Sequence, residues 1–341
     1  MEAIDFFCGA GGLTKGLSLS GINVIAGIDI DESFKKTFEY NNKKSKFYTY
    51  NIKELGPEKL KSLFPNLKEN DPNMLFAGCA PCQAFSQQRR SSTKRTDEDA
   101  LAYFGSLVAA FLPGQVFVEN VKGLRNTKVF SEFVRLLLDN NYDVWHSILN
   151  AEDFGVPQHR KRLVLLATRG IKVQAPLATH GIFGKPLKTV EDAIGHFSNI
   201  SIGQEDKNIP NHKAALLSDI NLKRIKLTPK NGGGWASWPE ELKLECHKNT
   251  TGYTDIYGRM SWKSQAPTIT CKCISLSNGR YGHPEQDRAI SLREAAALQS
   301  FPDDYIFFGN QGNIAKQIGN AVPVEMARAI GNHLQALRFK H

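Results

Sequence analysis

The chain has 341 residues, which is enough for two domains or for one large domain with an insertion, and its 41% hydrophobic and 23% charged residues are ordinary for a globular protein. A formal net charge of +9 favours a polyanionic partner, but it fits equally well a protein that is merely basic. Six scattered cysteines exclude a disulfide scaffold, and no apolar run approaches the roughly 20 residues needed to span a bilayer, so we expect a cytoplasmic protein with no membrane contact.

The first half of the chain alternates short apolar runs with helical patterns. Strands are predicted at residues 3–7, 23–28, 47–50, 74–77, 116–119, 144–149 and 163–167. Helices are predicted between them, for example at residues 31–42, 101–112 and 130–140. Such alternation is typical of βαβ units, so the expected fold class is α/β with a doubly wound, mostly parallel sheet.

The alternation stops after about Arg169. From there to about Arg288 the chain is rich in Gly, Pro, Asn, Ser and Lys, and we interpret this stretch as a smaller, irregular inserted domain. Helical pattern returns at residues 291–299, where Ser291 is a plausible N-cap with Glu294 at the capping-box position, and again at 324–337. The predicted domains are residues 1–175 plus 290–341, and residues 176–289.

A glycine-rich turn follows the first predicted strand. Residues 5–12 lead from that strand into a helix, and Asp29 ends the second strand 18 residues beyond Gly11. Glycines let the backbone approach a ligand closely, and an acid at this place can accept hydrogen bonds from ribose hydroxyls. Both a dinucleotide and S-adenosylmethionine fit. The dinucleotide fingerprint would have Gly where this chain has Thr14, which counts somewhat against a dinucleotide.

Cys82 lies in the loop that leaves the predicted strand at residues 74–77. Ligands and chemistry gather at the carboxyl ends of strands in open α/β sheets, so this thiol is a candidate nucleophile. The alternative is a core cysteine, because free cysteines are among the most buried residue types.

Two further segments carry candidate site residues. Glu119 ends the predicted strand at 116–119 and can face the same crevice as Cys82, although a solvated acid at a strand end is common. In an extended segment Gln158, Arg160 and Arg162 share one face, and the alternative for such a charge run is a solvated edge strand.

Taken together, these segments resemble the DNA (cytosine-5)-methyltransferase family in order and spacing, over nearly the whole chain. The matching motifs are the turn at residues 6–12, Pro81-Cys82-Gln83, Glu119-Asn120-Val121, the Gln-x-Arg-x-Arg at 158–162, residues 293–302, and Gly319-Asn320-Ala321-Val322-Pro323. Residues 257–270 are also similar to the end of the family's variable region.

The chain departs from the family pattern at four positions. Cys79 and Ala80 stand where the family more often has Gly and then Pro or Phe, and Ala297 replaces a common Arg. Asn51 stands where an Asp often contacts the adenine amino group, which puts that contact in doubt. None of these departures removes a catalytic group.

The resemblance implies a role for each matching residue. Cys82 would attack carbon 6 of an extruded cytosine, Glu119 would act at its N3, and Arg160 and Arg162 would surround the base and its phosphate. The cofactor would be S-adenosylmethionine, leaving S-adenosylhomocysteine, and the residues implied to bind it are Phe6, Gly9, Gly11, Asp29, Ile30, Asn51, Pro81, Asn320 and Val322. The residues expected to contact DNA in the loop after Cys82 are Gln83, Ser86, Arg89 and Arg90.

The resemblance also implies partners. The substrate would be double-stranded DNA, with residues 176–289 reading the sequence, and Trp235, Trp238 and Trp262 fit the core of that part better than a DNA contact. We expect a monomeric modification enzyme that acts on the nucleoid. A restriction endonuclease for the same site, not bound in a stable complex, is a further expected partner.

Three other interpretations stay open on the residues alone. Cys79-Ala80-Pro81-Cys82 has the pattern of a thiol–disulfide oxidoreductase, for which Cys79→Ser would abolish activity, whereas a methyltransferase should keep it. A zinc site that uses Cys271 and Cys273 with the first pair has unusual spacing, so we expect no metal. A non-enzymatic DNA-binding module would transfer no methyl group.

Overall fold

The computed structural model describes residues 1–81, 99–182, 184–245 and 255–338. Two compact units are present. The first comprises Met1–Asn150, Lys161–Ala178 and Met326–His341, and the second comprises Ala151–Arg160 and Thr179–Glu325. Among the described residues, no helix is both long and apolar enough to cross a membrane.

A seven-stranded sheet forms the centre of the first unit, with strand order β3-β2-β1-β4-β5-β7-β6. Its strands are β1 (Glu2–Phe6), β2 (Asn23–Asp29), β3 (Lys46–Thr49), β4 (Met74–Gly78), β5 (Gln115–Val121), β6 (Tyr142–Asn150) and β7 (Lys161–Arg169). Strand β7 runs in the direction opposite to the other strands of the sheet and pairs antiparallel with both β5 and β6. All seven predicted strands and the mostly parallel α/β fold are thereby confirmed.

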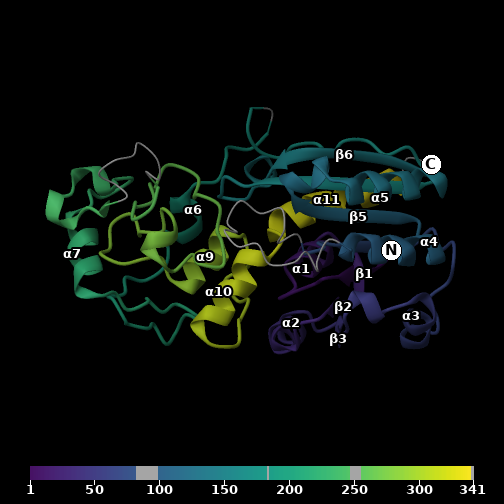
Figure 1. The fold of residues 1–341 in the computed structure, drawn as a ribbon, viewed down its shortest axis with the longest axis horizontal. Coiled ribbons are helices and arrows are strands. Elements are labelled where there is room, and N and C mark those ends of the chain that lie inside the picture. Colours follow the sequence, from purple (N-terminus) through teal and green to yellow (C-terminus); the bar gives the residue numbers. More distant parts are fainter. Residues whose placement is uncertain (82–98, 183, 246–254, 339–341) are drawn as a thin grey trace. The chain divides into compact units, whose positions relative to one another are not determined.

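The helices that connect these strands are α1 (Gly12–Leu19), α2 (Lys35–Asn41), α3 (Pro57–Leu63), α4 (Ala100–Phe111) and α5 (Lys128–Asp139), with short 3-10 turns at Glu32–Phe34, Ile52–Glu54 and Lys122–Asn126. The last helix of the chain, α11 (Val324–Arg338), follows the second unit. Helix α11 lies next to β5, whose first residue Gln115 donates from its side chain to the Leu334 carbonyl at 3.0 Å (Figure 1).

The central strand β4 explains why an apolar run precedes the Cys82 loop. All five of its residues are buried, and β4 pairs with β1 on one side and with β5 on the other. Strands covered on both faces read as continuous apolar runs rather than alternating ones. On one face, Phe76 of β4 packs with Phe6 of β1 and with Phe111 of α4.

The second unit is loop-rich, as predicted for its middle part. Its helices are α6 (Val190–Ile194), α7 (Asp219–Leu227), α9 (Leu292–Leu298) and α10 (Gln311–Asn320), with 3-10 turns at Ala151–Phe154, Trp235–Ser237, Glu240–Leu242 and Leu276–Asn278. Hydrogen bonds from side chains to backbone carbonyls hold the loops of this unit together. Arg259 is fully buried and donates to the carbonyls of Thr228, His283 and Ile225 at 2.7–3.0 Å.

The three tryptophans of this unit differ in burial. Trp238 is 3% exposed and packs edge-on against Tyr257, with the Arg224 guanidinium over both rings. Trp235 packs partly buried against the same cluster, and the Trp262 ring lies edge-on to His283. Core packing therefore describes Trp238 and Trp235, whereas Trp262 is half-buried and its indole nitrogen donates to Glu285 at 2.8 Å.

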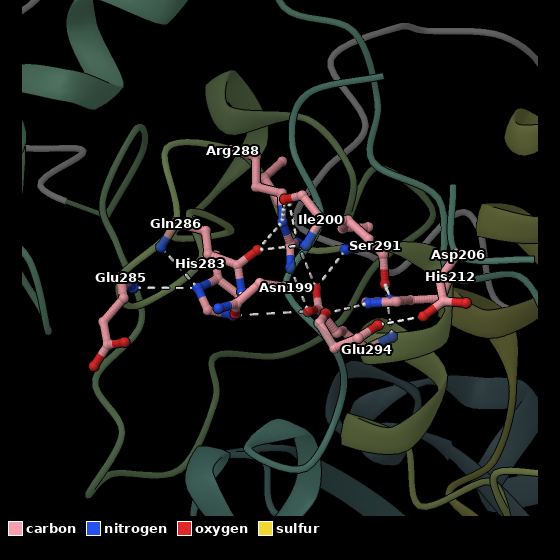
Figure 2. A network of polar contacts seen from close by, with 12 residues as sticks. Asn199, Ile200, Asp206, His212, His283, Glu285, Gln286, Arg288, Ser291 and Glu294 are labelled. Carbon is pink, nitrogen blue, oxygen red and sulfur yellow. Dashed lines mark hydrogen bonds and ion pairs between the residues drawn. The ribbon is translucent and has the colours of Figure 1, made fainter. Parts of the chain in front are cut away.

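A buried ion pair fixes the start of α9 (Figure 2). Arg288 donates to both carboxylate oxygens of Glu294 at 2.6 and 2.7 Å, and both side chains are 1% exposed. Glu294 also accepts from the Ser291 backbone, which completes the predicted capping box. Burial alone would raise the pKa of Glu294, but Arg288 outweighs it and the pKa lies below its usual range. Burial lowers the pKa of the neighbouring His283 to about 4, so that ring is neutral at pH 7.

Glu294→Gln is expected to lower the free energy of unfolding by about 3 kcal/mol, because it leaves the buried Arg288 charge unpaired. Urea unfolding followed by circular dichroism measures this loss. The control is Glu132→Gln on α5, where the pair Lys128–Glu132 is 90% and 60% exposed, with an expected loss of about 0.5 kcal/mol or less. Equal losses in the two variants would contradict a buried, paired Glu294.

The compact units do not follow the predicted domain boundaries. Residues 151–160 and 290–325 group with the second unit, although the sequence assigned both to the catalytic domain. Buried side-chain bonds account for this grouping: Gln158 donates to the Leu298 carbonyl at 3.0 Å and to Gln299 Oε1 at 2.9 Å. The division into catalytic and recognition domains is a division by function and stays a prediction.

Candidate active site

Part of the predicted site lies outside the described residues. This holds for Cys82, the candidate nucleophile, and for Gln83, Ser86, Arg89 and Arg90. The described part of their loop runs from the end of β4 to Pro81, which is exposed. A side chain at Gly78 would bring a Cβ to 3.0 Å from the Phe6 carbonyl oxygen, so the close approach of β4 to β1 favours glycine at this exit.

Asn120 of β5 anchors the loop that leads to Cys82. Its side-chain amide donates to the Ala80 carbonyl at 2.9 Å, and its Oδ1 accepts from the Val121 backbone at 2.8 Å. Asn120 is only 2% exposed. A bond buried to this degree competes little with water, so the backbone two residues before Cys82 is fixed to β5.

Glu119 lies beside Asn120 in the same strand and is 2% exposed. Its Oε1 is 3.0 Å from Nε of Arg162, which lies on the neighbouring strand β7 and is 14% exposed. No aligned hydrogen bond joins these two atoms, so the contact is an ion pair. Its Oε2 accepts from the Cys79 thiol at 2.8 Å. A solvated strand-end acid is therefore excluded.

The two arginines of the Gln-x-Arg-x-Arg segment have different surroundings. Arg162 faces Glu119 within the first unit. Arg160 belongs to the second unit, is 3% exposed, and donates to the carbonyls of Ile269 and Ala321 at 3.1 and 3.2 Å. These contacts brace the protein backbone. The role of Arg160 around the base and its phosphate stays a prediction.

Gln158 is also buried, which excludes a solvated edge strand for this segment. It is fully buried, and its Oε1 accepts from the Ile269 backbone at 2.8 Å. Gln158 and Arg160 are buried, whereas His159 between them is exposed. These two side chains therefore lie on the same face of the segment, as predicted.

The glycine-rich turn after β1 has the open backbone expected of a ligand site. Gly9 has φ 51° and Gly11 has φ 90°, conformations that favour glycine. A Cβ built at Gly9 would meet no heavy atom within 4 Å, so the turn leaves open space there. Asp29, at the end of β2, accepts from the Gly9 backbone at 2.8 Å and from the Asp31 backbone at 2.9 Å. Burial raises the pKa of Asp29, although these two hydrogen bonds act in the opposite direction.

Phe6 is not placed where its side chain could meet a ligand. It is fully buried, with ring centroids 5.1 Å from Phe76 and 5.2 Å from Phe104. The residue at the turn is Phe7, which is half-buried and has φ 62°. A cofactor contact by the Phe6 side chain therefore finds no support in its surroundings, and the sequence pattern alone did not distinguish the two phenylalanines.

Ile30 and Asn51 follow the carboxyl ends of β2 and β3. Ile30 is 65% exposed, which is unusual for an isoleucine next to a buried strand. The Asn51 side chain accepts from the Lys53 backbone at 3.1 Å and so caps a short 3-10 turn. Because β1, β2 and β3 are parallel neighbours, their carboxyl ends lie at one edge of the sheet.

Thr14, the residue that departs from the dinucleotide fingerprint, has a structural partner. Its hydroxyl donates to Asp5 Oδ2 at 2.6 Å, and both residues are fully buried. Burial raises the pKa of Asp5 to about 7, while the Thr14 hydrogen bond acts in the opposite direction. Glycine could not supply this hydroxyl, which explains why threonine occupies the position.

Asn320 and Val322, the remaining predicted cofactor residues, belong to the second unit. Asn320 is exposed and its Oδ1 accepts from the Cys271 thiol at 3.0 Å, whereas Val322 is 4% exposed. The preceding Gly319 has a clear packing reason, because a Cβ there would lie 2.3 Å from the Cys271 backbone nitrogen. Whether these residues bind a cofactor stays a prediction.

The thiols described by the structure differ in their surroundings. None of Cys8, Cys79, Cys271 and Cys273 forms a disulfide in the described part of the chain. Burial raises the pKa of Cys273 to about 12, which makes this thiol a poor nucleophile at pH 7. Cys79 is the one of these four whose thiol donates to Glu119.

Comparisons with known proteins match nearly the whole chain. A family model described as C-5 cytosine-specific DNA methylase matches residues 1–336. The chain is 43% identical to the Type II methylase M.HgiDII of Herpetosiphon aurantiacus, over 97% of this chain and 94% of that protein. It is 30% identical to the Type II methyltransferase M1.HphI of Haemophilus parahaemolyticus, over 96% and 84%.

Solved structures share the fold. A proposed DNA modification methyltransferase encoded within an E. coli prophage superimposes with a TM-score of 0.78 at 23% identity, covering 99% of both chains. The Dnmt2 methyltransferase of S. pombe superimposes with a TM-score of 0.68 at 17% identity, again covering 99% of both chains. These similarities do not favour a thiol–disulfide oxidoreductase or a non-enzymatic module.

Proposed function

Because the chain belongs to the C-5 cytosine-specific DNA methylase family, we propose that it methylates carbon 5 of a flipped cytosine in one short duplex DNA sequence. The methyl donor is S-adenosylmethionine in this proposal. The observation that carries it is the buried Glu119, held between Arg162 and Cys79 and adjacent to the Asn120 anchor of the Cys82 loop.

The residues at the carboxyl ends of β1, β2 and β3 fit the methyl donor. The open turn at Gly9 and Gly11 would admit the amino-acid portion, and the Asp29 carboxylate retains lone pairs for ribose hydroxyls. The exposed Ile30 offers an apolar surface for adenine. When bound, S-adenosylmethionine supplies an electrophilic methyl group on its sulfonium. Asn51, Pro81, Asn320 and Val322 are further proposed contacts.

Carbon 5 of cytosine is a poor nucleophile, so the enzyme must activate the base. In the proposed mechanism Glu119 is protonated in the complex with the base. The Cys82 thiolate forms a bond to carbon 6, and the Glu119 proton moves to N3 as electron density reaches the ring. Carbon 5 then becomes enamine-like and can take the methyl group. Water takes the carbon 5 proton, elimination of Cys82 regenerates the free thiolate, and the N3 proton returns to Glu119. Arg162 keeps the Glu119 carboxyl group in place before and after this proton transfer.

The proposed substrate contacts follow from the need to extrude the base. Rotating a cytosine out of the duplex costs roughly a few kcal/mol, which protein–DNA contacts must offset. Gln83, Ser86, Arg89 and Arg90 are the proposed phosphate contacts of the loop after Cys82. Residues 176–289 are the proposed sequence-reading domain, and 1–175 plus 290–341 the catalytic domain.

The relatives suggest the biological setting. The names of M.HgiDII and M1.HphI describe Type II methylases, so we propose that this enzyme is the modification half of a restriction–modification system. It would act as a monomer on nucleoid DNA in the cytoplasm. A cognate restriction endonuclease would recognise the same site without a stable complex.

Incubating the protein with methyl-labelled S-adenosylmethionine and plasmid DNA tests the function. Label is expected in duplex DNA, and bisulfite sequencing should place it on cytosine within a single short sequence. A protein that transfers no label to DNA, or that labels adenine, would contradict the proposal. Label on free thiols of a protein substrate would point to a different transferase.

A further inference from the structure

Cys79 is the first residue after β4. The family more often has a glycine at this position, and glycine has no side chain that could donate a hydrogen bond. The sequence alone gave this thiol no part in methyl transfer. Its position in the structure is specific, because its sulfur lies 2.8 Å from Oε2 of Glu119. Its own backbone nitrogen donates to the Phe6 carbonyl at 3.3 Å, which ties this point of the loop to β1.

The two oxygens of Glu119 have different neighbours. Oε1 faces Nε of Arg162 from β7 at 3.0 Å, and Oε2 accepts from Cys79 in the loop after β4. Among the described residues, Arg162 and Cys79 are the titratable or charged groups in contact with the Glu119 carboxylate. With one group on each oxygen and 2% exposure, the carboxylate has a fixed orientation and little access to water.

We propose that Cys79 is a positioning residue for methyl transfer, whose thiol orients the Glu119 carboxylate and stabilises the negative charge that forms on it during attack on the base. This inference rests on the proposed function of Glu119 at N3. As the Cys82–carbon 6 bond forms, the proton leaves Glu119 for N3 and a carboxylate remains. The Cys79 proton stays on sulfur as a hydrogen-bond donor, and the thiol gives up no electron pair and forms no covalent bond.

The effect belongs to the chemical step rather than to binding. Hydrogen bonds to an ionised group are stronger than those to a neutral one, so the thiol stabilises the state after proton transfer more than the state before it. A thiol is a weak donor, which limits the size of the gain. A hydroxyl at the same place can do the same work, whereas a methyl group cannot.

Steady-state kinetics of Cys79→Ala and Cys79→Ser test the proposal. Cys79→Ala is expected to lower kcat about tenfold with KM for DNA and for S-adenosylmethionine within about twofold of wild type. Cys79→Ser is expected to recover most of that loss. Wild-type kcat in the alanine variant, or an equal loss in both variants, would overturn the inference. Absence of methyl transfer by the wild-type protein would overturn the proposed function instead.

A second measurement needs neither DNA nor turnover, and it remains available if Cys79→Ala fails to fold. In a Cys82→Ser background, iodoacetamide labelling of Cys79 is followed by peptide mass spectrometry. Thiolate formation next to a buried carboxylate is unfavourable, so adding Glu119→Gln is expected to speed labelling of Cys79 at least about threefold. Equal labelling rates with and without the Glu119→Gln substitution would show that the thiol and the carboxylate are not coupled.

Discussion

The Cys82→Ala variant is expected to lose methyl transfer by on the order of 10⁴-fold or more, because a side chain without a nucleophile cannot form the bond to carbon 6. Without that bond carbon 5 does not become enamine-like and cannot take the methyl group. Cys79 cannot substitute for it, since its sulfur already faces Glu119.

Single-turnover assays with excess enzyme measure this loss. The variant should still bind S-adenosylmethionine and duplex DNA with affinities near those of wild type, which isothermal titration calorimetry and gel shift can establish. Residual activity within about tenfold of wild type, with binding intact, would mean that another group is the nucleophile.

Glu119→Gln is expected to lower kcat by about 10²- to 10⁴-fold. Glutamine keeps the size of the side chain but cannot give a proton to N3, and it leaves Arg162 without its ion-pair partner. Because Arg162 is largely buried, we also expect a lower melting temperature, so activity should be measured well below the transition.

Glu132→Gln on α5 is the matched control, because it makes the same substitution at an exposed carboxylate. Its kcat should equal that of wild type. A Glu119→Gln enzyme within about threefold of wild type would exclude proton donation by Glu119.

Much of the fold could be predicted from local pattern. The seven strands follow from apolar runs bounded by turn residues, and the start of α9 follows from the spacing of Ser291 and Glu294. The reversal of β7 could not be predicted this way, because a buried strand has the same pattern in either direction. Helix α10 was missed because Gly312 and Gly319 interrupt its pattern, and the Asn310 cap stabilises it locally.

The candidate site, like the fold, has a part that the sequence predicted and a part that it could not predict. Strand ends and motif order predicted Glu119, Asp29 and the glycine turn, because parallel strands bring their carboxyl ends to one edge. Contacts between residues distant in sequence could not be predicted. The bond from Cys79 to Glu119 spans 40 residues, and the bond from Arg160 to Ala321 spans 161.

The most direct test of the central claim uses DNA in which the target cytosine is replaced by 5-fluorocytosine. After methyl transfer the fluorine cannot leave as the carbon 5 proton does, so elimination stops and the enzyme stays attached. In the presence of S-adenosylmethionine, a DNA–protein adduct that survives denaturation is expected, with mass spectrometry placing it on Cys82. No adduct with the wild-type protein, or an adduct that persists in Cys82→Ala, would contradict the account.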